Sequence, residues 1–416
     1  MYHIIKPITR LAFIFAIVVL AACTKDHDGM MVENDSTCKM QAVPGTVVAH
    51  SPQSSQIYLG SPSICVLPDS NYVVSCDLNS TLAPYVDSPV TWVFLSENKG
   101  KTWNKIATLQ GQFWSQLFYH HDALYIMGTS KSGGDILIRK SGDGGHTWTN
   151  PVDGETGRIR QNGKYHCAPT PVISHNGRIW RAMEDLMGGG TVWGQAFRAF
   201  MISAPENSDL LKASSWLQSN RMGYNSTYLG GDFGGWLEGN AVVTPSGDMV
   251  DVLRTNYQVN GDELASIIKI SSDGATASFD PQTGFVPFPG GCKKFAILHD
   301  PVSNLYWSIS NYVPDVYKNG NAERTRNTLA LLSSPDLLHW NIQGIVLTHH
   351  DVLTHGFQYV DFKFEGPDII FVSRTAFDDG EGGANSQHNA NFITFHRIPY
   401  FRNYANPAIW QWLLPH

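Results

Sequence analysis

An arginine, a tyrosine and a histidine in the first half of the chain have the side chains that β-elimination of a uronic acid requires. That reaction needs a cation to neutralise the C5 carboxylate, a base near C5 and an acid for the leaving oxygen. Arg181, Tyr165 and His120 supply these groups, since tyrosine can act as base and acid once a cation lowers its pKa. The structural alternative is that Arg181 pairs with Glu184 or Asp185, Tyr165 is a core residue and His120 lies in a turn.

Five further polar residues lie beside expected strands and are candidates for binding a substrate. Tyr224 and Glu238 bound a glycine-rich segment, and two arginines end corresponding strands. Binding residues concentrate where loops converge, so we expect this set at one end of a central channel. The five are His166, Tyr224, Glu238, Arg254 and Arg374.

A separate histidine, His50, is a candidate for hydrolytic chemistry. It precedes Ser51-Pro52 near the start of the expected fold. Histidine transfers protons near neutral pH, so His50 suits general acid or base catalysis. The alternative is a solvated histidine before a turn.

Metal-ligand motifs are absent from the sequence, and we expect no metal and no cofactor. There is no CxxC pair, and the spacing of His349, His350 and His355 fits no standard ligand set, which favours a polar loop. The sequence is also compatible with a structural cation in a central channel.

A short repeated motif predicts the architecture. The segments 96–103 (SENKGKTW) and 141–148 (SGDGGHTW) share the pattern S-x-(D/N)-x-G-x-T-W, and degenerate copies begin at 203, 271 and 333. The acidic or amide side chain satisfies turn amides, glycine adopts a positive φ, and tryptophan packs beneath the turn. Such Asp boxes resemble those of sialidase-like β-propellers.

Between these turn motifs, alternating apolar residues predict a β-strand in each repeat. We therefore predict an all-β fold, a β-propeller of four-stranded antiparallel blades, forming one domain over residues 45–416. Six blades can be counted, and a seventh is expected from residues 40–60 closing onto the C-terminus. The predicted strands are 71–77, 122–128, 177–184, 247–254, 304–311 and 367–374.

The N-terminus predicts export. Lys6 and Arg10 precede an apolar run of residues 11–20, which is too short to span a bilayer and is typical of a signal peptide over residues 1–22. Leu20-Ala-Ala-Cys23 resembles a bacterial lipobox, so we expect lipidation of Cys23, a polar tether over 23–44 and attachment to the outer membrane, exposed at the surface of a Gram-negative bacterium. The alternative is an ordinary secretory signal with a chance cysteine.

Composition excludes two classes of protein. With 16% charged and 12% aromatic residues, most of the chain is not disordered. A net charge of −7 argues against nucleic acid as a partner.

Several segments together resemble a family of seven-bladed propeller enzymes that act on carbohydrates. The family includes ulvan lyases of polysaccharide lyase family 25, L-rhamnose-α-1,4-D-glucuronate lyases of family 42 and α-L-rhamnosidases of glycoside hydrolase family 145. The resemblance covers roughly residues 45–405, and it rests on 112–120, 124–129, 165–171, 175–184 and 374–396.

The resemblance implies roles for the candidate residues. In the lyases a histidine, a tyrosine and an arginine act, which match His120, Tyr165 and Arg181, with Tyr224 a further member. Ulvan lyases carry an additional histidine that 128–134 lacks, which argues against ulvan cleavage. The rhamnosidases place a single catalytic histidine at a position that matches His50.

We therefore predict hydrolysis of terminal L-rhamnose linked α-1,4 to D-glucuronate on plant or dietary glycans of the arabinogalactan type. Elimination at the same linkage is the alternative. A sialidase needs three arginines, a tyrosine with a glutamate partner and an Arg-Ile-Pro motif in its first blade. Arg181, Arg254 and Arg374 imitate the arginines, but Arg397-Ile-Pro399 lies at the wrong end of the chain. A non-catalytic glycan-binding lipoprotein is the last alternative.

Overall fold

A computed structural model describes residues 42–80, 88–190, 192–257 and 259–405. The predicted signal peptide, the predicted lipidation site Cys23 and all of the predicted tether before residue 42 lie outside these residues. Among the described residues, no helix combines the length and the apolar character needed to cross a bilayer.

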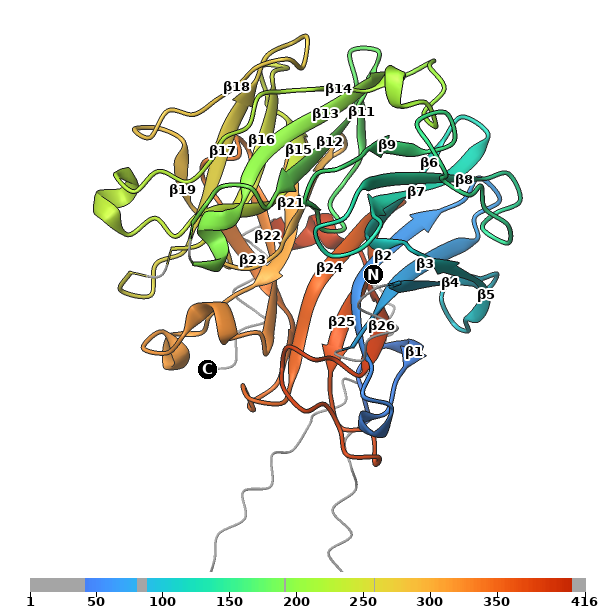
Figure 1. Ribbon diagram of the computed structural model, residues 1–416. Coiled ribbons are helices and arrows are strands. Elements are labelled where there is room, and N and C mark those ends of the chain that lie inside the picture. Colours follow the sequence, from blue (N-terminus) through green and yellow to red (C-terminus); the bar gives the residue numbers. More distant parts are fainter. Residues whose placement is uncertain (1–41, 81–87, 191, 258, 406–416) are drawn as a thin grey trace, which may run out of the picture. The chain divides into compact units, whose positions relative to one another are not determined.

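The described chain forms six antiparallel sheets in sequence order, which are the blades of a propeller (Figure 1). The first blade has the order β2 (Tyr58–Val66), β3 (Tyr72–Asn79), β4 (Val90–Ser96), β5 (Asn104–Gln110). The second is β6 (Phe113–His120), β7 (Ala123–Thr129), β8 (Ile136–Ser141), β9 (Arg158–Arg160). The third is β10 (Tyr165–His166), β12 (Arg178–Asp185), β13 (Arg198–Pro205), β14 (Leu217–Gln218), with β11 (Ile173–His175) also on β12.

The fourth blade is β15 (Trp236–Val243), β16 (Met249–Thr255), β17 (Leu264–Ile270), β18 (Ala277–Ser278), with β19 (Phe285–Pro287) also on β17. The fifth is β20 (Ala296–Asp300), β21 (Leu305–Asn311), β22 (Thr328–Ser334), β23 (Asn341–Thr348). The sixth is β24 (Gly356–Glu365), β25 (Asp368–Ala376), β26 (Phe392–Ile398), β1 (Thr46–His50). Short 3-10 helices lie in the loops between strands and, for the last of them, after β26. They are η1 (Gln53–Ser55), η2 (Trp193–Ala196), η3 (Ala213–Ser215), η4 (Tyr228–Gly231), η5 (Asp315–Tyr317), η6 (Ala322–Arg324) and η7 (Phe401–Ala405).

The all-β propeller prediction is confirmed, and each of the six predicted strands lies within two residues of an observed one, from β3 to β25. The seventh blade is not formed by the described residues. Residues 46–50 do pair with the C-terminal strand, as β1 against β26, but they complete the sixth blade (Figure 1). This pairing covers an edge that would otherwise be open.

The Asp boxes form the turns that the motif predicts. Ser141 Oγ donates to Asp143 Oδ1 at 2.8 Å and accepts from Gly145 N at 2.8 Å. Gly145 has a φ of 104°, and Trp148 Nε1 donates to its carbonyl at 2.8 Å. The box at 96–103 repeats the serine and amide contacts. Each box therefore fixes a turn between the outer strands of its blade.

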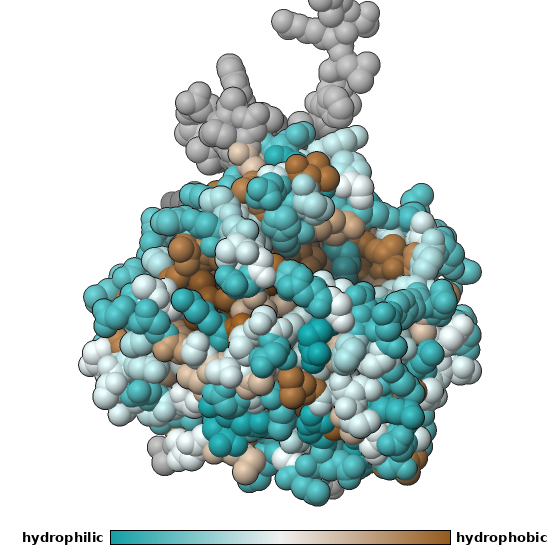
Figure 2. Space-filling model, turned by 90° about the horizontal axis from the view of Figure 1, so that it is seen from above, coloured by the Kyte–Doolittle hydropathy of each residue, from teal (hydrophilic) through white to brown (hydrophobic). Residues whose placement is uncertain are grey.

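Neighbouring blades pack face to face through apolar side chains. One cluster joins Met127 of β7 to Met183 of β12 and Phe200 of β13, and all three are fully buried or nearly so. The molecular face seen from above is mainly hydrophilic, with apolar residues gathered in recesses (Figure 2). The first strands of most neighbouring blades contact one another (β2 with β6 and β24, and β20 with β15 and β24), so their ends converge around the centre.

Candidate active site

A cavity of about 190 Å³ lies where the innermost strands begin. In an antiparallel blade the start of the first strand lies beside the end of the second, so both contribute to this end of the channel. The cavity, called here the cationic pocket, is lined by Tyr58, Ser61, Asn79, Trp114, His166, Cys167, Trp193, Leu237, Glu238, Arg254, Tyr359, Arg374 and His388.

A tyrosine–glutamate pair lies in this pocket. Tyr359 Oη donates to Glu238 Oε1 at 2.7 Å, although the two residues belong to β24 and β15. Each sits at a bulge where the strand register shifts, with φ of 54° at Tyr359 and 58° at Glu238. Bulges and positive φ re-aim side chains, and such strain concentrates at functional sites.

Arg254 sets the charge of the pair. Its Nη1 lies 3.0 Å from Glu238 Oε2, and its Nη2 lies 2.6 Å from Glu323 Oε1. Burial raises the pKa of Glu238, but Arg254 and neighbouring donors outweigh this and leave that pKa below its usual value. Burial and the Glu238 charge raise the pKa of Tyr359. Glu238 is therefore an ionised acceptor and Tyr359 a protonated donor.

Arg374 is a buried cation without a carboxylate partner among the described residues. It is 5% exposed, and Nη2 donates to the His388 carbonyl and lies 3.2 Å from His388 Nδ1. Its buried Nε has no hydrogen-bond partner in the described chain. Burial lowers the pKa of Arg374 to about 10, and Arg374 in turn lowers the pKa of His388 to about 2, so His388 is neutral.

Two guanidinium groups lie near the Tyr359 ring, and a third contacts its partner Glu238. Arg374 lies 5.1 Å and Arg326 5.8 Å from its centroid, and Arg254 reaches its partner Glu238. Arg326 is held behind the pocket, with Nη1 2.6 Å from Gln358 Oε1.

A histidine and two tryptophans form the opposite wall. His166 Nδ1 lies 2.8 Å from Glu184 Oε2, which fixes the ring and leaves Nε2 without a partner among the described residues. Trp114 packs edge-on at 4.4 Å. Trp193 is 53% exposed at the rim, where an aromatic face can stack on a sugar.

Four of the five predicted binding residues meet in the cationic pocket: His166, Glu238, Arg254 and Arg374. The fifth, Tyr224, stacks on Phe233 at 5.8 Å and does not line it.

The residues of the predicted elimination triad are not brought together. His120 lies at the far end of β6, with Nε2 2.8 Å from the Glu206 carbonyl. Tyr165 packs in the core 6.2 Å from Phe200. Arg181 is fully buried and donates to the carbonyls of Thr170 and Ala168.

The structural alternative for the triad holds only in part. Tyr165 is a core residue, but Arg181 does not pair with its two neighbouring carboxylates. Glu184 is bound by His166, and Asp185 is bound by Arg198 and Arg221.

His50 ends β1 outside the cationic pocket. Its Nε2 lies 2.9 Å from Asp379 Oδ2, and its ring stacks on Phe392 at 4.5 Å. The next residue, Ser51, lines a second cavity beside Tyr58.

Tyr359 and Arg326 were not predicted. For Tyr359 a sequence signal was available in the segment 356–361 (GFQYVD), where polar residues interrupt the apolar pattern of a strand. In the described parts of the chain, no group of three or more histidine, cysteine, aspartate or glutamate side chains is placed to hold a metal ion.

Comparison with solved structures identifies the fold. No family model matches the sequence, and no curated protein matches it. An α-L-arabinanase of Penicillium chrysogenum, solved with arabinobiose, is 14% identical with a TM-score of 0.55 over 86% of this chain and 99% of that one. A sialidase of Trypanosoma rangeli, solved with sialic acid, is 14% identical with a TM-score of 0.56 over 90% of this chain and 60% of that one. A GH93 α-L-arabinofuranosidase of Fusarium graminearum is 13% identical with a TM-score of 0.52, over 85% and 96%. The chain therefore shares the sialidase-like β-propeller fold of these proteins.

Proposed function

We propose that this protein is a glycosidase whose cationic pocket binds a carboxylate-bearing sugar. The observation that carries the proposal is Arg374, a buried guanidinium with no carboxylate partner in the described chain, beside the Tyr359–Glu238 pair. Around the Tyr359–Glu238 pair, three guanidinium groups are accompanied by two carboxylates, Glu238 itself and Glu323. An unpaired buried charge is costly, and a substrate carboxylate would neutralise it.

Tyr359 is the proposed nucleophile. Its oxygen attacks the anomeric carbon while its proton passes to Glu238 Oε1, 2.7 Å away, and the glycosidic C–O bond breaks. A neutral phenol approaches a sugar acid without the repulsion that a carboxylate nucleophile would meet. His166, oriented by Glu184, donates the proton that the leaving oxygen needs.

Water completes the cycle. It attacks the same carbon, passes its proton to His166 and displaces Tyr359, which recovers its proton from Glu238. Two displacements at one carbon retain the anomeric configuration.

Elimination is the second candidate, because the same pocket satisfies its requirements with different residues from those predicted. Arg374 would neutralise a glucuronate carboxylate, and Tyr359, after passing its proton to Glu238, would remove the C5 proton. His166 would protonate the leaving O4. With the rhamnose–glucuronate linkage that the sequence predicts, the leaving sugar is L-rhamnose.

Hydrolysis of that linkage at His50 is the third candidate. The His50–Asp379 pair supplies a general acid or base at a second position. His50→Gln removes that group and leaves the cationic pocket intact.

One panel of substrates tests these candidates. Purified protein is given the 4-methylumbelliferyl glycosides of N-acetylneuraminic acid and glucuronic acid, and a rhamnose-α-1,4-glucuronate disaccharide. We expect fluorescence from an acidic glycoside, lost in Tyr359→Phe and kept in His50→Gln. Ultraviolet absorbance of a 4,5-unsaturated product would establish elimination instead. Rhamnose release without that absorbance, lost only in His50→Gln, would establish the His50 site, and no turnover of any substrate would leave a glycan-binding protein.

The proposed location is the outer membrane, through lipid on Cys23, where the partner would be a plant or dietary glycan. Mass spectrometry of the N-terminal peptide tests this. A diacylglyceryl modification on Cys23 is expected, and an unmodified N-terminus elsewhere would refute it.

A further inference from the structure

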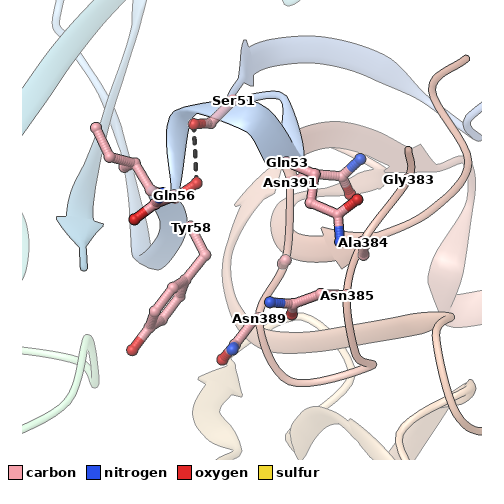
Figure 3. Close-up of a pocket in the computed structure, with 11 residues that line it drawn as sticks. Ser51, Gln53, Gln56, Tyr58, Gly383, Ala384, Asn385, Asn389 and Asn391 are labelled. Atoms are coloured by element: carbon pink, nitrogen blue, oxygen red, sulfur yellow. Dashed lines mark hydrogen bonds between the residues drawn. The ribbon is translucent and has the colours of Figure 1, made fainter. Parts of the chain in front are cut away.

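A second cavity of about 340 Å³ opens beside the cationic pocket and has a different chemistry (Figure 3). None of its lining residues carries a charge at neutral pH, and most of the polar ones are carboxamides. They are Ser51, Gln53, Gln56, Ile57, Tyr58, Gly383, Ala384, Asn385, Asn389, Ala390 and Asn391. We call it the amide cavity.

The two cavities are neighbours. Tyr58 lines both, and His388 of the cationic pocket directly precedes Asn389 of the amide cavity. The Tyr58 ring lies 5.7 Å from the Arg374 guanidinium and 6.4 Å from the His388 ring. A ligand with its carboxylate at Arg374 could therefore extend past Tyr58 into the amide cavity.

One wall of the amide cavity is preformed. Asn391 Nδ2 donates to the Phe377 carbonyl and to Asp379 Oδ2, both at 2.9 Å, and its Oδ1 accepts from Phe377 N. Asp379 Oδ1 also accepts from the backbone of Glu381 and Gly383. These contacts hold the loop in place before any ligand arrives.

Three of the remaining amides are available, whereas Asn389 Oδ1 lies 2.9 Å from His388 Nδ1. The side chains of Gln53, Gln56 and Asn385 form no hydrogen bond with any described residue, and Figure 3 shows them around the cavity with Tyr58. A carboxamide offers two donors and an acceptor, which matches a hydroxyl that both donates and accepts. Ile57 and Ala384 add the apolar contact that the ring carbons of a sugar need.

We propose that the amide cavity binds a neutral, hydroxyl-rich sugar, the leaving residue of the substrate whose acidic sugar occupies the cationic pocket. This inference rests on the proposed function for the order of the two sugars. The substrate class is therefore a glycan in which an acidic sugar is joined to a neutral one, and the absence of charge among the lining residues selects against a second acidic sugar.

Binding to the amide cavity can be tested without turnover. Saturation-transfer NMR with methyl α-L-rhamnopyranoside and methyl β-D-galactopyranoside is run on the full chain, on Gln53→Ala/Asn385→Ala and on Gln282→Ala. Both cavity residues are exposed and unbonded, so the melting temperature should not change, and Gln282 is an exposed amide elsewhere. We expect transfer from at least one sugar, lost only in the double variant. No transfer, or equal transfer from all three proteins, would overturn the subsite.

A kinetic comparison tests the order of the sugars. The double variant should lower kcat/KM about tenfold, mainly through KM, for an acidic sugar linked to a neutral hexose, because two neutral hydrogen bonds are lost. It should lower kcat/KM for the methylumbelliferyl glycoside of the same acid by less, because that leaving group has no sugar hydroxyls for the two amides to bind. Equal losses on both would refute the leaving-group position. If no acidic glycoside is turned over, the proposed function fails, and the NMR result alone decides the subsite.

Discussion

Replacing Arg374 with methionine should stabilise the fold while lowering kcat/KM about a hundredfold or more. Burial lowers the pKa of Arg374 to about 10, well below its usual value, so holding the charged form below that pH costs the folded protein stability. At about 1.4 kcal/mol per pKa unit, the cost is about 3 kcal/mol. Methionine keeps most of the buried volume and removes the charge.

The net gain is smaller than this cost. The variant loses the hydrogen bond from Nη2 to the His388 carbonyl, worth about 1 kcal/mol. We therefore expect the free energy of unfolding to rise by about 2 kcal/mol and the melting temperature by roughly 2–4 °C. Losing the substrate-carboxylate contact should lower kcat/KM about a hundredfold or more.

Calorimetry and steady-state kinetics on the same preparations check the expected gain in stability and the expected loss of activity. Arg397→Met is the matched control, since Arg397 lies 2.8 Å from Asp368 on the surface and has carboxylate partners. It should lose less than about 1 kcal/mol and keep full activity. An Arg374→Met protein that melts earlier and still turns over substrate would refute the reasoning. An anionic sugar should also raise the melting temperature of the wild type but not of Arg374→Met.

Three further outcomes are expected. Glu238→Gln should lower kcat at least a hundredfold. Because Arg254 holds the Glu238 pKa below its usual value, wild-type kcat/KM should stay constant as the pH falls to about 5. A decrease in kcat/KM above pH 5 caused by protonation of Glu238 would contradict this assignment. Asp143→Ala should destabilise the second Asp box by about 1 kcal/mol at pH 7 in urea unfolding. The Asp143 pKa is lowered to about 2 by its hydrogen bonds, so the difference from wild type should shrink as the pH falls through that value, and a pH-independent difference would exclude the carboxylate as its source. A chain that begins at residue 52 lacks β1 and should unfold at lower urea concentration than one that begins at residue 42; equal midpoints would mean that β1 adds no stability.

The local elements could be predicted from the sequence because each is encoded by neighbouring residues. An Asp box is complete within eight residues, as Ser141 to Trp148 shows, and the second strand of a blade follows from its own alternation. The number of blades could not be predicted in this way. It depends on whether residues 46–50 add an outer strand to the last sheet or begin a sheet of their own.

The site was harder to predict because it depends on strand polarity and bulges. His120 and Trp114 lie on the same strand, β6, but they are six positions apart. Six positions along a strand correspond to about 20 Å, so only Trp114 reaches the pocket. Tyr359 meets Glu238 across 121 residues, and both reach the pocket from bulges at positive φ. Residue type and local pattern can mark each residue as a candidate, but they do not show that the two side chains meet.

The pairing of β1 with β26 has a consequence for how the molecule folds. The first described strand, β1, cannot pair until the last described strand, β26, is present, because the paired residues are more than 300 positions apart in the sequence. Contacts of such long sequence separation are slow to form, so ring closure is expected to be a late step in folding. Until then the innermost strands of blades one and six lack their final neighbours, and Tyr58 and Arg374, which come from these two blades, have no fixed separation. The binding site would therefore appear only when the ring closes.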